Sequence, residues 1–343
     1  MNSAIRTNNV SALKRTLVLA FIANVVFIAI AVSIVGKWGD FVSATQSLPA
    51  SAFAVTIALA SVNYLVRGLR YHYLNRSLGI KLGLWETLQF YFAGFGFSLT
   101  PGRIGEFARI WLIRRSHSYP ARVLAPPIFM DRLCDLFAAL ALCLCTVVFY
   151  LDKLQYLVVA VALIAVGFCL LLWPSLLLAA LRLGAQWLPR SKHLFAQLRR
   201  IVRQISTLLR PKVLLPSLLV SVLAWSAEAL ALFVLARSFT PDIHFASVVF
   251  IFAFANLIGT LTFIPGGLGG TETIMVTMLM GLNMHFEAAA AATFVLRTGT
   301  LWFGVSLGIV FVVWLLRRAV PVHAISRLSA GAEAAASGRL ASE

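Results

Sequence analysis

Six apolar runs of about 20 residues or more constrain this chain more than any other feature. A run of this length crosses the hydrocarbon core as one helix, because in lipid each backbone polar group must find its partner within the chain. The runs cover residues 16–35, 48–66, 126–150, 154–178, 213–236 and 287–316. Hydrophobic residues make up 60% of the chain and charged residues 12%, and the mean hydropathy is +0.90. These values exclude an ordinary soluble protein and predict an all-α polytopic membrane protein.

Two further apolar regions, residues 84–113 and 246–282, are each interrupted near the middle by a Pro-Gly dipeptide. The interruptions read Thr100-Pro101-Gly102-Arg103-Ile104-Gly105-Glu106 and Ile264-Pro265-Gly266-Gly267-Leu268-Gly269-Gly270-Thr271-Glu272. An arginine follows each interruption at nearly the same distance, Arg132 in the first half and Arg297 in the second. Interrupted helices in corresponding places of two halves are typical of transporter binding sites. We therefore expect the function to lie at these two breaks.

The basic residues predict how the broken regions enter the membrane. The chain has 29 Lys and Arg against 12 Asp and Glu, a net charge of +17, and its basic residues lie between the apolar runs. If residues 84–100 crossed completely, one of two basic clusters would lie outside. The clusters are Arg67, Arg70, Arg76 and Lys81 before the region, and Arg109, Arg114, Arg115 and Arg122 after its break. A re-entrant hairpin keeps both in the cytoplasm, as the positive-inside rule favours, with anionic lipid headgroups rather than nucleic acid as partners of the charge.

Counting crossings then predicts the symmetry. Each half contains two spans, a hairpin and a third span, and because three crossings are an odd number the second half is inverted. We expect one integral membrane domain over residues 1–318, with six spanning helices plus two re-entrant helical hairpins in an inverted repeat. The repeats cover residues 13–150 and 154–316. Residues 181–212 are expected to be a basic connector, either amphipathic on the cytoplasmic leaflet or solvated, and residues 319–343 a disordered cytoplasmic tail.

The breaks have the composition of an anion site. Thr100 is a plausible N-cap and Pro101 a favourable first residue of a half-helix over residues 101–113, whose N–H groups would point into the membrane. The second break is rich in glycines that can adopt positive φ and form a nest of N–H groups, with phosphate as the natural ligand. The predicted substrate-binding residues are Pro101, Gly102, Arg103, Gly105, Glu106, Arg132, Pro265, Gly266, Gly267, Gly269, Gly270, Glu272 and Arg297. The alternatives are glycines that only permit close packing, and structural ion pairs of the two glutamates with Arg132 and Arg297.

Three other ionisable residues within apolar runs are candidates for proton coupling. Glu228, in the middle of a span, is the best of them, against the alternative of a simple polar contact. Asp131 and Asp135 share a helix face close to the expected cytoplasmic interface, where a solvated or headgroup-facing role is the alternative. The sequence holds no G-x-S-x-G, H-E-x-x-H or P-loop motif and no His/Cys cluster with metal spacing. We therefore expect no enzyme activity, metal or cofactor.

The paired segments 97–106 and 263–269, followed by Glu272 and Arg297, resemble the flippase-like lysylphosphatidylglycerol synthase transmembrane-region family. The resemblance covers about residues 13–316. In multidomain relatives this region moves an aminoacylated phospholipid between leaflets, and a separate soluble domain makes that lipid. Stand-alone members are associated with moving lipids or lipid-linked glycans, including hopanoid-related lipids. We expect this chain to lack the synthase domain, which argues against lysyl-lipid synthesis.

The expected function is translocation of an anionic phospholipid or a polyprenyl-phosphate-linked lipid across a bacterial inner membrane, with both termini cytoplasmic. Arg103, Arg132 and Arg297 would hold the phosphate, and a proton gradient is one candidate driving force. The expected partners are membrane lipids and, in addition, envelope-biosynthesis enzymes. Two alternatives stand beside this function: an intramembrane lipid-modifying enzyme that uses Glu106 and Glu272, and a scaffold for envelope-lipid synthesis.

Overall fold

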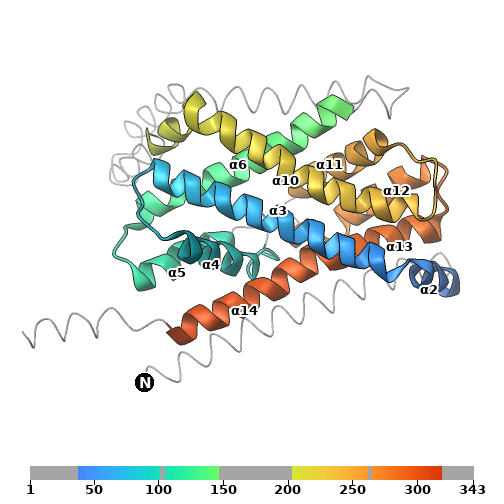
Figure 1. Cartoon of the computed structure of the whole chain (residues 1–343), viewed down its shortest axis with the longest axis horizontal. Helices are drawn as coiled ribbons and strands as arrows, with labels where there is room; N and C mark the ends of the chain where they lie inside the picture. The colour runs from blue at the N-terminus through green and yellow to red at the C-terminus, as the bar shows by residue number, and fades with distance from the viewer. Residues whose placement is uncertain (1–37, 101–104, 147–202, 262–264, 319–343) are drawn as a thin grey trace, which may run out of the picture.

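A computed structural model of the chain describes residues 38–100, 105–146, 203–261 and 265–318, and every regular element in these ranges is a helix (Figure 1). The first half contains α2 (Trp38–Ser47), α3 (Ala50–Ser77), α4 (Leu84–Phe95), α5 (Ala108–Ser116) and α6 (Ala121–Thr146). The second half contains α10 (Pro211–Arg237), α11 (Phe245–Leu261), η4 (Pro265–Gly267), α12 (Gly270–Met280), α13 (Phe286–Arg297), η5 (Thr298–Trp302) and α14 (Phe303–Arg318). The all-helical prediction is confirmed for the described ranges.

Within the described ranges, three helices are long and apolar enough to cross a membrane: α3, α10 and the continuous helix Phe286–Arg318. They correspond to the predicted spans 48–66, 213–236 and 287–316, although α3 continues well past Val66 to Ser77. Helix α6 occupies the predicted span 126–150 and carries charged side chains in its middle. The predicted spans 16–35 and 154–178, most of the connector 181–212 and the tail 319–343 lie outside the described residues. The count of six spans therefore stays a prediction.

Each broken region forms two helices that pack against each other across the break, α4 with α5 and α11 with α12. Helix α4 has 12 residues and α5 has 9. At 1.5 Å per residue they are only about 18 and 14 Å long, against a hydrocarbon core of about 30 Å. Of the expected half-helix over residues 101–113, residues 105–107 form a 3₁₀ turn that leads into α5, and residues 101–104 lie outside the described residues. Thr100 caps the start of this turn, because the Thr100 Oγ1 accepts a hydrogen bond from the Gly105 N–H at 2.6 Å.

The hairpin of each half packs against the last helix of the other half. Helix α4 packs on α14, the last helix of the second half, and α11 packs on α6, the last helix of the first half. Between them α3 and α10, which occupy equivalent positions in the two predicted repeats, pack directly on each other. The α4–α5 pair lies toward one end of the long axis and the α11–α12 pair toward the other (Figure 1). The packing is thus reciprocal between the halves.

One apolar cluster joins the ends of several helices at the same end of the molecule. Its buried members include Ile113, Leu124 and Val312, with partly buried Leu78 and Leu316 packed around them. The exposed basic residues next to these positions are Arg76, Arg114, Arg317 and Arg318. They flank one end of the bundle, as expected if both basic segments around the first break lie on the same side of the membrane.

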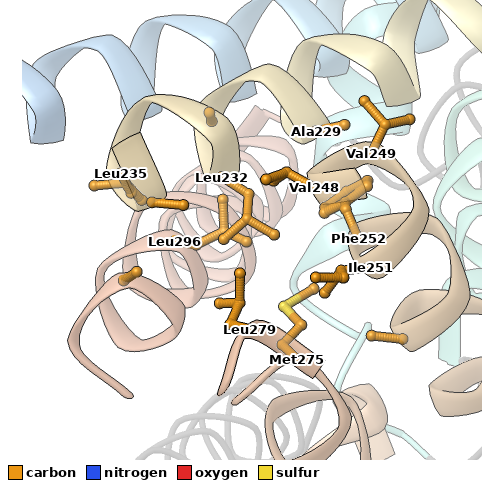
Figure 2. Close-up of a cluster of buried hydrophobic side chains, with 14 of the residues drawn as sticks. Ala229, Leu232, Leu235, Val248, Val249, Ile251, Phe252, Met275, Leu279 and Leu296 are labelled. Carbon is orange, nitrogen blue, oxygen red and sulfur yellow. The ribbon is translucent and has the colours of Figure 1, made fainter. Parts of the chain in front are cut away.

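The largest apolar core lies in the second half and holds its hairpin in place (Figure 2). Leu232 and Leu235 of α10, Phe252 of α11, Leu279 of α12 and Leu296 of α13 are all buried in it. Because these positions face one another from four helices, α11 and α12 are anchored against two long helices. The polar residues of the second break are thereby fixed relative to α13.

Candidate functional site

The charged residues around the first break form one buried network. The side chains of Arg70 and Asp131 are both fully buried and lie 2.5 Å apart, and Arg70 also contacts Asp135 at 2.9 Å. Arg67 binds Asp135 at 2.5 Å. Arg109 binds Glu106 at 2.5 Å and reaches Asp131 at 3.5 Å. Burying these six charged groups costs desolvation free energy, which only their dense mutual pairing offsets.

Arg132 completes the network and is its most exposed guanidinium. Its Nη2 lies 3.0 Å from Glu106 and 3.3 Å from each of Asp131 and Asp135. The Arg132 side chain is 22% exposed, whereas the three carboxylates are at most 7% exposed. A single guanidinium that touches three carboxylates at the edge of the network is the member most accessible to a ligand.

Two expectations about these residues are wrong. Arg67, Arg70 and Arg109 were expected in basic clusters with lipid headgroups as their partners, but they are 4%, 2% and 0% exposed and are paired with carboxylates. The side of the membrane on which they lie stays a prediction. Their burial follows from the carboxylates that face them. For the same reason the solvated or headgroup-facing interpretation of Asp131 and Asp135 is wrong, because both are buried and each is bound by three or more guanidinium contacts of the network.

Aromatic rings and a glycine shape the space for Arg109. Its guanidinium lies 5.0 Å from the Tyr71 ring centroid and 4.7 Å from that of Tyr91, within the range of cation–π attraction. A β-carbon on Gly94 of α4 would overlap with the Arg109 side chain. The hairpin therefore holds this arginine between two rings and against a backbone without a side chain.

The second break contains a smaller ionic site. Arg297, the last residue of α13, donates from Nε to Glu272 at 2.5 Å and from Nη2 to the carbonyl oxygen of Gly266 at 2.7 Å. Both side chains of the pair are under 10% exposed. The π-helix η5 begins at the next residue, and π turns are frequent at functional sites. Arg297 thus joins the break to the helix that follows it.

The prediction that the glycines of the second break adopt positive φ is confirmed for three of the four. Gly266, Gly267 and Gly269 have φ of 63°, 68° and 83°, which favours glycine. Gly270 is the first residue of α12 and does not share the positive φ. A β-carbon on Gly267 would lie 2.6 Å from Thr271 Oγ1. Close packing is thus one reason for glycine at this position.

Corresponding residues of the two breaks form the same ion pair, Glu106 with Arg132 and Glu272 with Arg297. The pairing that the sequence left as an alternative is present in both halves. Pro101, Gly102 and Arg103 lie outside the described residues, so their predicted roles stay predictions. Of Pro265, the structure describes the backbone, which begins η4.

A partly enclosed cavity lies between the two ionic sites. It leaves about 50 Å³ in which water centres can lie, enough for several waters. Its polar lining comes from both halves of the chain: Arg67, Ser98, Glu228, Asn256, Arg297 and Thr300. Glu228, predicted from its place in the middle of a span, therefore faces the same space as an arginine of each ionic site.

Sequence reasoning missed Arg67, Arg70 and Arg109 as site residues. A signal for the first two was present, because they are three residues apart on a helix that continues the apolar run 48–66. Ser221 and Trp225 of α10 were missed as well. Ser221 accepts a hydrogen bond from Arg70, and Trp225 donates to Asp135 at 3.2 Å. Such contacts between distant segments leave no local pattern in the sequence.

Comparison with known proteins identifies relatives of this chain. The family model described as "Lysylphosphatidylglycerol synthase TM region" matches residues 17–308. A "UPF0104 membrane protein" of Methanothermobacter thermautotrophicus (strain Delta H) is 23% identical over 315 residues, which cover 85% of this chain and 93% of that protein. A second UPF0104 membrane protein match from the same organism is 31% identical over 93 residues, covering 27% of this chain and 28% of that protein.

Proposed function

We propose, since the chain belongs to the family of the lysylphosphatidylglycerol synthase TM region, that this multi-pass membrane protein moves a phosphate-bearing lipid between leaflets. The family and the membrane-protein relatives point to lipid metabolism. The substrate class is an anionic phospholipid or a polyprenyl-phosphate-linked lipid. Its phosphate enters between the two breaks and its acyl chains remain in lipid.

The cavity between the ionic sites is the observation that carries the proposal. In a network with a purely structural role, we would expect every charged group to contact only other groups of the protein, because buried charges are stabilised only by their partners. Here Arg67 and Arg297, from opposite halves, both line a space large enough for several waters. Arg132 adds an accessible guanidinium at the edge of the first site. Guanidinium groups bind phosphate by charge-assisted hydrogen bonds, so the arrangement suits an anionic headgroup.

The reciprocal packing of the hairpins supports an inverted repeat. Helix α4 on α14 and α11 on α6 are the same contact with the halves exchanged, and the hairpins lie toward opposite ends of the molecule (Figure 1). An inverted repeat offers each leaflet an equivalent route to the centre. The short arms α4 and α5 favour re-entrant hairpins over full crossings.

The basic end of the bundle supports the proposed orientation. Arg76, Arg114, Arg317 and Arg318 flank one end, and the positive-inside rule assigns such an end to the cytoplasm. Both termini would then be cytoplasmic, in a bacterial inner membrane. Envelope-biosynthesis enzymes are the protein partners that this location would bring within reach.

Reconstitution tests the function directly. Vesicles carrying the full chain and phosphatidylglycerol with a fluorescent NBD group on one acyl chain are treated with dithionite, which quenches the outer leaflet. If the protein exchanges the lipid, dithionite should quench more than the half of the NBD fluorescence that lies in the outer leaflet. Arg132→Gln should reduce the rate of lipid exchange at least tenfold. Asp242→Asn, at an exposed position between α10 and α11 that does not line the cavity, serves as the matched control and should keep the parent's rate. Exchange no faster than in protein-free vesicles would reject translocation.

Mass spectrometry of the same lipid separates the alternatives. A lipid-modifying enzyme would change its mass through Glu106 and Glu272, although each carboxylate is paired with an arginine rather than free to transfer protons. A scaffold would neither modify nor move it. Lipid exchange with unchanged mass is the result expected from the proposed function.

A further inference from the structure

Among the residues that the structure describes, the buried network contains one more positive than negative group. Its salt bridges join Arg67, Arg70, Arg109 and Arg132 to Glu106, Asp131 and Asp135. Four guanidinium groups against three carboxylates leave one positive charge in excess. Because an uncompensated charge at this depth is costly, the network favours a further counter-ion close by.

Glu228 is a fourth carboxylate in the right place. It lines the same cavity as Arg67, and its charge acts on that guanidinium. The Nη2 of Arg67 donates to Asp135, whereas its Nε has no hydrogen-bond partner within the described ranges. With Glu228 ionised, the cluster and Glu228 together are neutral. With Glu228 protonated, the cavity faces one uncompensated positive charge.

The second ionic site does not supply this excess. Arg297 also lines the cavity, but its charge is matched by Glu272 at 2.5 Å. An anion that enters the cavity therefore meets two ionic sites. The Glu272–Arg297 pair has no net charge, whereas the net charge of the arginine network depends on whether Glu228 is ionised.

We propose that Glu228 and the anionic group of the lipid are alternative counter-ions for this positive charge, so that binding of the anion is coupled to protonation of Glu228. The proton comes from water onto a carboxylate oxygen of Glu228 and returns to water when the anion leaves and the carboxylate pairs again. This rests on the proposed function and adds its energy source, because a proton gradient would then drive the lipid in one direction.

The groups around Glu228 make it the one expected to titrate. Tyr64 and Arg67 of α3 and Arg297 of α13 line the cavity with it. Behind Arg67, Asp135 of α6 binds Arg67, Arg70 and Arg132, and Asp131 binds Arg70. Helix α11 contributes no ionisable residue. Guanidinium groups stay charged at all pH values used here. Asp131 and Asp135 each contact three of these guanidinium groups and Glu106 contacts two, whereas Glu228 lines the cavity that the anion enters.

Calorimetry with a short-chain lipid measures the coupling. Dihexanoyl-phosphatidylglycerol keeps a single charge between about pH 5 and 9, because a phosphodiester does not titrate there. It is added to the full chain in phosphatidylcholine nanodiscs, with empty nanodiscs as the blank. Buffers of different ionisation enthalpy report the protons bound. We expect the parent to take up close to one proton per lipid at high pH, with the dissociation constant rising about tenfold per pH unit.

Glu228→Gln should bind the lipid with no proton uptake and with the same dissociation constant at pH 6 and pH 9. Asp242→Asn is the matched control and should keep the parent's slope. Binding by the parent without proton exchange, or an unchanged slope in Glu228→Gln, would overturn the coupling while anion binding stands. Absence of binding by the parent would instead count against the proposed function.

Thermal unfolding tests the charge balance without any ligand. In phosphatidylcholine nanodiscs, Glu228→Gln should unfold at a lower temperature than the parent, and the lipid should raise its midpoint more than it raises the parent's. The double variant Arg67→Gln with Glu228→Gln restores neutrality and should recover part of the loss. Equal midpoints for the parent and Glu228→Gln would show that Glu228 is not the counter-ion.

Discussion

Leu99 lies against Gly266, so the two breaks of the chain touch each other. A β-carbon on Gly266 would come within 2.9 Å of the Leu99 Cδ2 atom. Leu268 belongs to the same small apolar cluster, with Leu301 and Val305 as its buried members. The two breaks therefore meet in the interior, beside the cavity that Leu301 and Val305 also line. Contact between the breaks is what a shared binding site requires.

Arg76 and Arg114 should lie on the same side of the membrane. In intact cells, single cysteines placed beside either arginine should be protected from an impermeant maleimide, and both should react once the cells are opened. The reason is the shared apolar cluster that joins the ends of α3, α5 and α14. Labelling beside Arg114 alone would contradict the re-entrant hairpin.

Arg132→Gln and Arg70→Gln should have different effects. Arg132 is partly exposed, and without it each of the three carboxylates of the network still has another arginine partner, so we expect the protein to fold but to lose lipid exchange. Arg70 is fully buried against Asp131 and Asp135, and breaking such a pair costs about 3–5 kcal/mol. Arg70→Gln should therefore lower the unfolding midpoint sharply. The reverse order of stabilities would contradict the assignment of Arg132 to ligand binding.

Gly94→Ala should displace Arg109. The β-carbon would overlap with the arginine side chain, whose Cδ and Cγ would lie at 3.0 Å. Overpacking of a filled interior costs about 1–3 kcal/mol, which thermal unfolding in detergent can measure. Gly39→Ala is the control, because nothing lies within 4 Å of its β-carbon. Equal unfolding midpoints for Gly94→Ala and Gly39→Ala would show that α4 can accommodate the extra methyl group without loss of stability.

Gly267→Ala separates conformational strain from the role of the break. Gly79 has a similar φ of 76° and open space around its β-carbon, so Gly79→Ala measures the cost of positive φ alone, about 1–2 kcal/mol. We expect Gly267→Ala to lose lipid exchange as well, because its β-carbon would push Thr271 at the start of α12. Unfolding midpoints and NBD-lipid exchange are compared for both variants. Unaltered exchange in a folded Gly267→Ala protein would remove the second break from the site.

The sequence predicted the long helices, and it named the members of one ion pair in each half only as an alternative to a role in substrate binding. Apolar length predicted α3, α10 and the helix Phe286–Arg318, and the duplicated spacing brought Arg132 and Arg297 to attention. It failed for Arg67, Arg70 and Arg109. The positive-inside rule treats each arginine as a partner of lipid headgroups, whereas these three bind carboxylates on α6 and, in Glu106, just before α5. Which carboxylate an arginine meets depends on how distant helices pack, and the local count of charges along the sequence does not contain this information.

The exchange of hairpins between the halves limits how the protein can move. Rocking one intact half against the other would have to separate α4 from α14 and α11 from α6 at the same time. The α4–α14 contact is close: a β-carbon on Gly96 would lie 3.2 Å from the backbone of Gly308. Sliding or tilting of a hairpin along its host helix breaks fewer contacts. The gates of an alternating-access cycle would then be the two hairpins, each opening one leaflet while the long helices stand still.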